Sequence, residues 1–139
     1  MDSRTWIEGK AMEWRDLQSF SFGDSPALAD ELAALVLAGR KTATCWAATD
    51  GMLTQVGERM VMLDGSGVPR AVIETVDLVQ RRFHDVDAAF AYEEGEGDRS
   101  LAYWQQAHRR YFRRRGQFAE DMLLYCERFR VVEHIAAPS

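Results

Sequence analysis

One junction in the sequence, where a well-delimited helix is followed at once by a strand, constrains the fold more than any other feature. Ser25 can cap the start of the helix, and Pro26 suits its first position because the missing N–H would be unpaired there anyway. Leucines and Val36 then recur at helical spacing on one face. Gly39 ends the helix, since glycine enters the left-handed conformation without a Cβ penalty. The sequence therefore predicts a helix that turns directly into the strand-like residues 42–47.

The rest of the chain mixes strand-like and helical runs without regular alternation. Apolar or alternating runs predict three further strands, at residues 59–63, 70–79 and 122–132, with a hairpin turn at 64–67. Helical spacing predicts a short helix over residues 87–94 and a longer one that starts at Asp98. This order favours an α+β fold around an antiparallel or mixed sheet, which can close into a barrel.

Length and composition limit the kind of protein. With 139 residues, 47% hydrophobic and 28% charged, the chain has the size and composition of one globular domain. Its net charge of −5 argues against coating long duplex DNA through bulk charge. The longest uncharged apolar run, residues 32–38, is too short to cross a bilayer, and the N-terminus lacks the apolar core of a secretion signal. We therefore expect a cytoplasmic protein with no membrane partner, and with Cys45 and Cys126 as buried free thiols.

Lys41 stands at the helix-to-strand junction next to Arg40. If it is partly desolvated there, its pKa falls and it can act as a general base; the alternative is two solvated cations at a helix C-terminus. Strand alternation places Glu74 on the more apolar face of residues 71–78, where a carboxylate needs a partner such as Lys41. The other interpretation is that Glu74 faces outward or pairs with a structural arginine. Thr44 adds a hydroxyl that could be a nucleophile or proton relay, although threonine is also common in strands.

A basic block with aromatic residues follows in the longer predicted helix. His108 lies on the apolar side of this helix, one turn from Trp104, and arginines including Arg109 follow it. Trp46 and Trp104 could stack a nucleobase while the arginines meet phosphates. In the alternative interpretation the aromatic stripe is core, His108 is a satisfied core residue and the arginines face water.

Acidic residues crowd into the segment before this helix. Glu94, Glu96 and Asp98 alternate with Gly95 and Gly97 and could bind a divalent cation through oxygen ligands, although the spacing does not match an EF-hand loop. A solvated turn, with Asp98 as the cap of the following helix, explains the pattern equally well. A divalent cation is therefore an option, and no cofactor is certain.

Several of these segments together resemble a known family. Residues 39–44 resemble the GxKxxT signature of the ASCH family, relatives of the PUA RNA-binding fold. The resemblance extends to residues 22–26, 72–75, 94–101 and 126–129. It implies a small PUA-like β-barrel of about six mostly antiparallel strands with surrounding helices, over residues 22–135. Residues 1–21 would then be an N-terminal extension, helical and packed on the domain, and residues 136–139 a frayed tail.

For function, the resemblance implies an RNA-directed protein with a cleft lined by the GxKxxT segment. The leading interpretation is binding and cleavage of single-stranded RNA. An alternative is hydrolysis of N4-acetylcytidine, with Lys41 as base, Thr44 as nucleophile and Glu74 as orienting or proton-shuttling carboxylate. A third is a non-catalytic module that binds RNA or a nucleotide, and the oligomeric state is left open. The other residues expected at the ligand are Arg40, Thr42, Trp46, Glu96, Asp98, Ser100, Trp104, His108 and Arg109.

Overall fold

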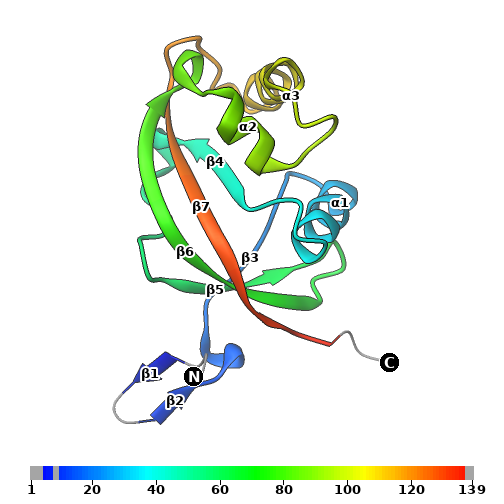
Figure 1. Cartoon of the computed structure of the whole chain (residues 1–139), viewed down its shortest axis with the longest axis vertical. Coiled ribbons are helices and arrows are strands. Elements are labelled where there is room, and N and C mark those ends of the chain that lie inside the picture. Colours follow the sequence, from blue (N-terminus) through cyan, green and yellow to red (C-terminus); the bar gives the residue numbers. More distant parts are fainter. Residues whose placement is uncertain (1–4, 8–9, 137–139) are drawn as a thin grey trace.

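The computed structural model describes residues 5–7 and 10–136 (Figure 1). Its helices are α1 (Pro26–Leu37), α2 (Ala88–Glu94) and α3 (Leu101–Arg114), with single-turn 3-10 helices η1 (Trp14–Asp16), η2 (Ala48–Asp50) and η3 (Phe83–Asp85). Its strands are β1 (Thr5–Ile7), β2 (Lys10–Met12), β3 (Ser19–Ser21), β4 (Ala43–Ala47), β5 (Arg59–Leu63), β6 (Pro69–Arg82) and β7 (Leu123–His134). None of the helices in these residues has the length and apolar character that a membrane crossing requires.

Helix α1 forms where the capping signals predict it. Ser25 is its N-cap, and the Ser25 hydroxyl accepts a hydrogen bond from an amide of the first turn at 3.2 Å. After the helix, Gly39 has a φ of +75°. The amides of Arg40 and Lys41 then both donate to the carbonyl of Leu35, at 2.9 and 3.1 Å. This closing turn leads the chain directly into β4, so the predicted helix-to-strand junction is confirmed.

Five strands form the main sheet, in the order β3-β5-β6-β7-β4. β3 pairs with β5 in parallel, and all other neighbours are antiparallel. The two long strands, β6 and β7, have register shifts at Val72/Ile73 and Thr75/Asp77, and both curve across the molecule in Figure 1. Such irregularities bend a strand and increase its twist. The predicted α+β fold with a mixed sheet is therefore confirmed.

The sheet is open where the resemblance implied a barrel of about six strands. Among the described residues, no pairing joins the two outer strands, β3 and β4. β3 is three residues long and pairs with β5, whereas β4 pairs with β7 at the opposite edge. The curvature of β6 and β7 therefore bends the sheet without a described hydrogen-bonded closure.

Two apolar clusters lie on either side of the junction between α1 and β4. One packs α2 and α3 onto β4 and β7, around Phe83, Trp104 and Phe112. The other packs α1 onto β5, β6 and β7, around Val36 and Met62. Figure 1 shows α1 beside one part of the sheet and the α2–α3 pair beside another. The chain segment that follows α1 thus runs between the two clusters.

The segment before residue 22 differs from the predicted helix. Its described part is a hairpin of β1 and β2, the turn η1 and the strand β3. Thr5, Trp6 and Ile7 have high strand propensity, and Gly9 disfavours a helix. β1 and β2 pair with each other, while β3 joins the main sheet. Residues 1–4 and 8–9 of this segment, and 137–139 of the expected tail, lie outside the described residues.

We expect Gly95→Ala to destabilise the protein more than Gly39→Ala. The two glycines have φ of +74° and +75°, a conformation that costs an L-residue about 1–2 kcal/mol. A Cβ at Gly39 meets nothing within 4 Å, whereas at Gly95 it collides with the carbonyl of Arg40. Urea denaturation measures the free energy of unfolding of each variant. Because the φ cost is the same at both positions, the extra loss in Gly95→Ala measures how closely the end of α2 approaches residue 40. Equal losses would contradict this packing.

Candidate functional site

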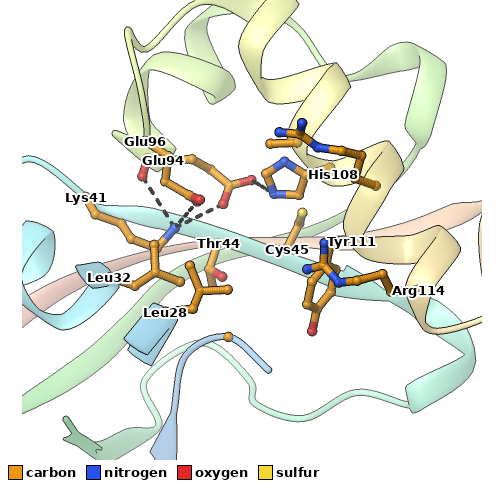
Figure 2. Close-up of a pocket in the computed structure, with 13 residues that line it drawn as sticks. Leu28, Leu32, Lys41, Thr44, Cys45, Glu94, Glu96, His108, Tyr111 and Arg114 are labelled. Atoms are coloured by element: carbon orange, nitrogen blue, oxygen red, sulfur yellow. Dashed lines mark hydrogen bonds and ion pairs between the residues drawn. The ribbon is translucent and has the colours of Figure 1, made fainter. Parts of the chain in front are cut away.

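The ammonium group of Lys41 is buried between two carboxylates (Figure 2). Nζ lies 3.1 Å from Glu94 Oε1, 3.1 Å from Glu96 Oε2 and 3.4 Å from the Glu94 carbonyl. Lys41 is only 2% exposed. Because an isolated buried charge is very costly, the pairing with the two carboxylates is what allows this lysine to lie inside the protein.

Glu94 connects Lys41 to helix α3. Its Oε2 accepts a hydrogen bond from the indole N–H of Trp104 and lies 3.3 Å from Nε2 of His108. His108 stacks on Trp104, with ring centroids 4.3 Å apart, and its Nδ1 lies 2.9 Å from the Trp104 carbonyl. One buried carboxylate therefore joins the α1–β4 junction to α3, and Trp104 supports it from the core.

Burial and neighbouring charges act against each other on these groups. Burial disfavours the ionised form of Glu94, but Lys41 and His108 outweigh it and hold the pKa of Glu94 well below its usual range. Burial also disfavours the charges of Lys41 and His108, but the attraction of Glu94 and Glu96 is larger and raises the pKa of both. Lys41 therefore remains an ammonium, without the free electron pair that a general base needs. The lowered pKa predicted for Lys41 is wrong, because its carboxylate partners outweigh desolvation.

Arg40 and Thr42 fix the backbone around the cluster. The guanidinium of Arg40 donates to the carbonyl of Gly95 at 2.8 Å and to that of Gly97. The amide of Thr42 donates to the carbonyl of Glu93 at 2.8 Å. These bonds hold the end of α2 and the following loop against the junction, which places two carboxylates at the buried ammonium. The structure thus gives both residues a positioning role where the sequence predicted ligand contacts.

A cavity of about 180 Å³ opens beside this cluster. Its lining includes Lys41, Thr44 and His108, and also Arg110 and Arg114 of α3. Figure 2 shows Arg114 on the helix that carries His108. One small cavity is therefore lined by a hydroxyl, an ammonium, an imidazole and two guanidinium groups. The sequence prediction that places Lys41, Thr44, Glu96 and His108 near each other matches this arrangement.

A second cavity, of about 270 Å³, adjoins the first. Thr44, Cys45 and Tyr111 line both cavities. The wall of the second is mostly apolar and aromatic and includes Trp46, whose indole N–H donates to the carbonyl of Gly51 at 2.8 Å. Two adjoining spaces of different character, one charged and one aromatic, are thus separated only by residues of β4 and α3.

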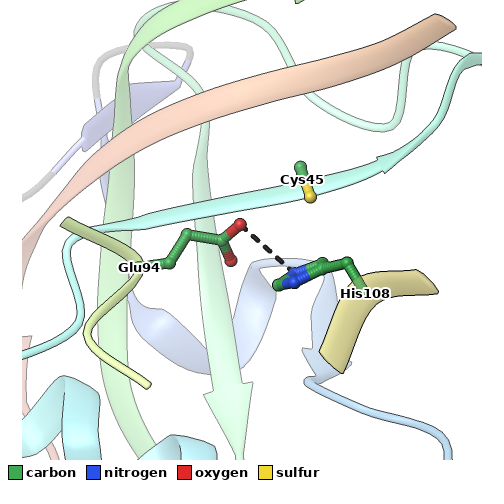
Figure 3. Close-up of side chains that lie close together, drawn as sticks. All are labelled: Cys45, Glu94 and His108. Carbon is green, nitrogen blue, oxygen red and sulfur yellow. Dashed lines mark ion pairs between the residues drawn. The ribbon is translucent and has the colours of Figure 1, made fainter. Parts of the chain in front are cut away.

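Cys45, Glu94 and His108 are close enough to be considered as metal ligands (Figure 3). Their donor atoms lie within 4.8 Å of one another, and thiolate, carboxylate and imidazole are all ligands of Zn²⁺. Both Glu94 oxygens, however, already accept hydrogen bonds, and the ammonium of Lys41 lies beside them. Burial and the charge of Glu94 also raise the pKa of the Cys45 thiol well above its usual range. A cation would have to displace Lys41 from its carboxylate, so the residues fit an ion poorly.

Glu74 lies away from the cluster, contrary to the predicted pairing with Lys41. Its carboxylate pairs with Arg59 and Arg130, at 2.9 Å each. Arg59 on β5 and Arg130 on β7 are its direct cross-strand neighbours. The prediction depended on an apolar face of one strand, and the registers of the two flanking strands supply arginines instead. The carboxylate beside Lys41 is therefore Glu94.

Asp98, Ser100 and Arg109 also lie outside the two cavities. Ser100, rather than the predicted Asp98, caps α3, and its hydroxyl accepts from the third amide beyond it at 3.0 Å. Asp98 accepts from the amide of Ser100 at 2.9 Å, so the acidic turn stabilises its own backbone. Arg109 pairs with Glu120 at 2.9 Å. The acidic turn and part of the basic block thus have structural partners within the chain.

Sequence reasoning missed Glu94 as the centre of the site. The sequence interpretation treats it only as one oxygen ligand in an acidic turn. One local feature could have indicated it: Glu94 is the last residue of a short helix and directly precedes Gly95. A glycine at that position allows the chain to reverse direction, which can turn the preceding side chain inward. The partner of Glu94 lies 53 residues away, which no local pattern reveals.

We expect Lys41→Met to lower the free energy of unfolding by about 3–5 kcal/mol, because it removes the lysine counter-charge of the buried Glu94 and leaves His108 as the cationic partner beside it. The double variant Lys41→Met/Glu94→Gln removes both charges and should recover a large part of the loss. Urea denaturation at neutral pH measures both. If Lys41→Met is as stable as the wild type, the ion pair does not have the buried character described above.

The fold and the site can be compared with known proteins. A family model described as the ASCH domain matches residues 18–133. The ASCH domain of Lactobacillus crispatus JV V101 is 38% identical, with a TM-score of 0.78 over 84% of this chain and 80% of that chain. A protein of Enterococcus faecalis V583 is 34% identical, with a TM-score of 0.76 over 84% and 77%. An ASCH protein of Zymomonas mobilis is 16% identical, with a TM-score of 0.59 over 86% and 69%, and this likeness concerns the fold alone.

No curated protein matches the chain. The ASCH domain is a PUA-like fold associated with RNA binding. The family model covers most of the chain, and the two more similar structures agree with it in both sequence and fold. This chain therefore belongs to the ASCH domain family.

Proposed function

We propose that this ASCH domain is a hydrolase that acts on a nucleobase-bearing ligand, and that N4-acetylcytidine is the ligand type that its residues suit best. The observation that carries the proposal is the buried Lys41 ammonium, held by Glu94 beside the cavity that Thr44 lines. Removing these charges from water destabilises the folded protein. Buried ionisable clusters beside cavities are nevertheless common at functional sites. The likeness to the ASCH family supports a nucleoside or RNA ligand.

The roles of the three residues follow from their charge states. Two N–H groups of the Lys41 ammonium are held by Glu94 and Glu96, and the third, which makes only the long 3.4 Å contact to the Glu94 carbonyl, turns to the acetyl carbonyl and stabilises the negative oxygen formed on attack. The Thr44 hydroxyl oxygen attacks the carbonyl carbon, the C–N bond breaks, and the hydroxyl proton passes to the leaving N4 nitrogen of cytidine. Water then hydrolyses the threonine ester and releases acetate. Lys41 thus acts as an electrophile rather than as the base that the family resemblance implies.

Glu94 and Glu96 take the carboxylate role that sequence analysis assigns to Glu74. Glu94 is 1% exposed and orients the ammonium of Lys41. The side chain of Glu96 is 20% exposed, touches the same ammonium and lines the cavity together with Thr44. We assign Glu94 to positioning and Glu96 to carrying the proton from the Thr44 hydroxyl to the leaving nitrogen.

Cleavage of single-stranded RNA is the second proposal, and the arginines at the first cavity favour it. Arg110 is exposed at the cavity, and among the described residues it forms no ion pair. Arg114 is also exposed and pairs with Asp24 at the longer distance of 3.4 Å. Both could bind phosphates of an RNA strand. This proposal, however, gives Thr44 no defined role, so ribonuclease activity ranks second.

We expect the purified protein to convert N4-acetylcytidine to cytidine and acetate, measured by chromatography of the nucleosides. Thr44→Val removes the nucleophile at nearly constant volume and should reduce the rate at least about a hundredfold, by analogy with the loss of one group that acts on the transition state. Thr49→Val is the matched control, because Thr49 is exposed and lines neither cavity. Its rate should equal that of the wild type.

Fluorescent single-stranded RNA, incubated with the same variants, separates the alternatives. Cleavage of RNA that is lost in Thr44→Val or Lys41→Met, without any deacetylation, would replace the first proposal with the second. RNA binding with steep salt dependence but neither reaction would leave a non-catalytic binding module. Equal deacetylation rates in wild type and Thr44→Val would remove Thr44 as the nucleophile.

A further inference from the structure

Glu127 is a buried carboxylate for which the reaction above has no use. It lies on β7 with 6% exposure. The hydroxyl of Thr75 donates to its Oε2 at 2.7 Å, and the hydroxyl of Thr54 lies 2.8 Å from that of Thr75. Among the described residues, no lysine or arginine forms an ion pair with Glu127, and its Oε1 accepts no hydrogen bond. Oε1 keeps some accessible surface, since it is not one of the unpaired atoms enclosed by protein, and it therefore has capacity for a donor from outside the chain.

The free oxygen belongs to a residue of the second, aromatic cavity. Glu127 lines that cavity together with Phe22, Trp46 and Tyr111, whose rings offer flat apolar surface. Thr44 lines both cavities, and in the sheet it is the direct cross-strand partner of Glu127. Directly opposed side chains of an antiparallel pair project from the same face, so the two residues are neighbours at the boundary of the cavities.

Resting on the proposed function, we propose that the second cavity holds the base of the ligand and that Glu127 Oε1 accepts a hydrogen bond from an exocyclic N–H of that base. Aromatic walls suit a planar ring, and a carboxylate at the wall selects a base that carries an amino or acylamino group. A base with a carbonyl at that position would set two oxygens against each other. The base then lies on one side of Thr44 and the acyl group on the other, next to Lys41.

In N4-acetylcytidine the exocyclic N–H is on the leaving nitrogen itself, so recognition by Glu127 has to be separated from the reaction by measuring the binding of an unreactive nucleoside. Sites built to hydrogen-bond a particular group strongly reject ligands that lack it, because their buried polar group is left unpaired. Burial raises the pKa of Glu127, and the charge of Glu58 adds to this effect, while the Thr75 hydroxyl and the charge of Lys41 act against it. Mildly alkaline buffer keeps the carboxylate ionised, so that it acts only as an acceptor.

Cytidine and uridine provide the test, because cytidine has a 4-amino group and a bare N3, uridine has a 4-carbonyl group and a proton on N3, and neither can be deacetylated. In mildly alkaline buffer, calorimetric titration of the wild type should give at least about tenfold tighter binding of cytidine, equivalent to about 1.4 kcal/mol. Glu127→Gln should abolish or reverse this preference, because its amide can present N–H groups to a carbonyl. Glu127→Asp keeps the charge but shortens the side chain, and should weaken cytidine binding. Glu133→Gln, the same chemical change on β7 outside both cavities, should keep the preference.

Equal binding of the two nucleosides by the wild type, binding of neither, or an unchanged preference in folded Glu127→Gln would overturn the inference. Thermal melting of each variant establishes that it is folded. Parallel assays with N4-acetylcytidine separate this inference from the proposed function. If cytidine is preferred in a way that depends on Glu127 but N4-acetylcytidine is not hydrolysed, the proposed base site stands and the proposed reaction is wrong. If Glu127→Gln hydrolyses N4-acetylcytidine with an unaltered KM, the proposed reaction stands and the proposed base site is wrong.

Discussion

The buried pair of Lys41 and Glu94 is the interaction on which the rest of the site depends. It joins three parts of the chain that are distant in sequence: the junction after α1, the end of α2 and, through Trp104 and His108, the helix α3. Because each of these charges would be strongly destabilising alone, both partners must be present for either to be buried. The two glycine turns, at Gly39 and Gly95, bring the backbone close enough for this contact.

The same interaction decides what the site can do chemically. An ammonium fixed by two carboxylates donates hydrogen bonds and attracts negative charge, but it does not accept protons. The cavity beside it adds the hydroxyl of Thr44, and the adjoining cavity adds aromatic surface and the carboxylate of Glu127. A ligand with a polar acyl group on a planar base would use both spaces. In the proposed function the charged cavity would hold the reacting acyl group, and the aromatic cavity the base.

Local signals predicted the parts of the fold that they control. Ser25 and Gly39 delimit α1, and the turn residues after β5 produce the hairpin with β6. The junction and the family signature also predicted that Lys41 and Thr44 lie together, and both line the first cavity. The partners did not, because they are set by tertiary contacts: Glu74 meets arginines of the two flanking strands, while Glu94 reaches Lys41 from another element. The expected N-terminal helix is likewise replaced by the strands β1 and β2, which the strand propensity of residues 5–7 favours.

The central claim, that Lys41 is a buried and permanently charged donor, can be measured directly. Nitrogen-15 NMR of the Lys41 side chain, assigned with Lys41→Met and titrated with pH, reports the protonation of Nζ. Attraction from Glu94 and Glu96 outweighs burial, so the account predicts that the signal keeps the ammonium shift up to at least pH 10.5, the ordinary lysine value. Loss of the ammonium signal below that pH would mean that desolvation dominates and that Lys41 can serve as a base. That result would contradict the account.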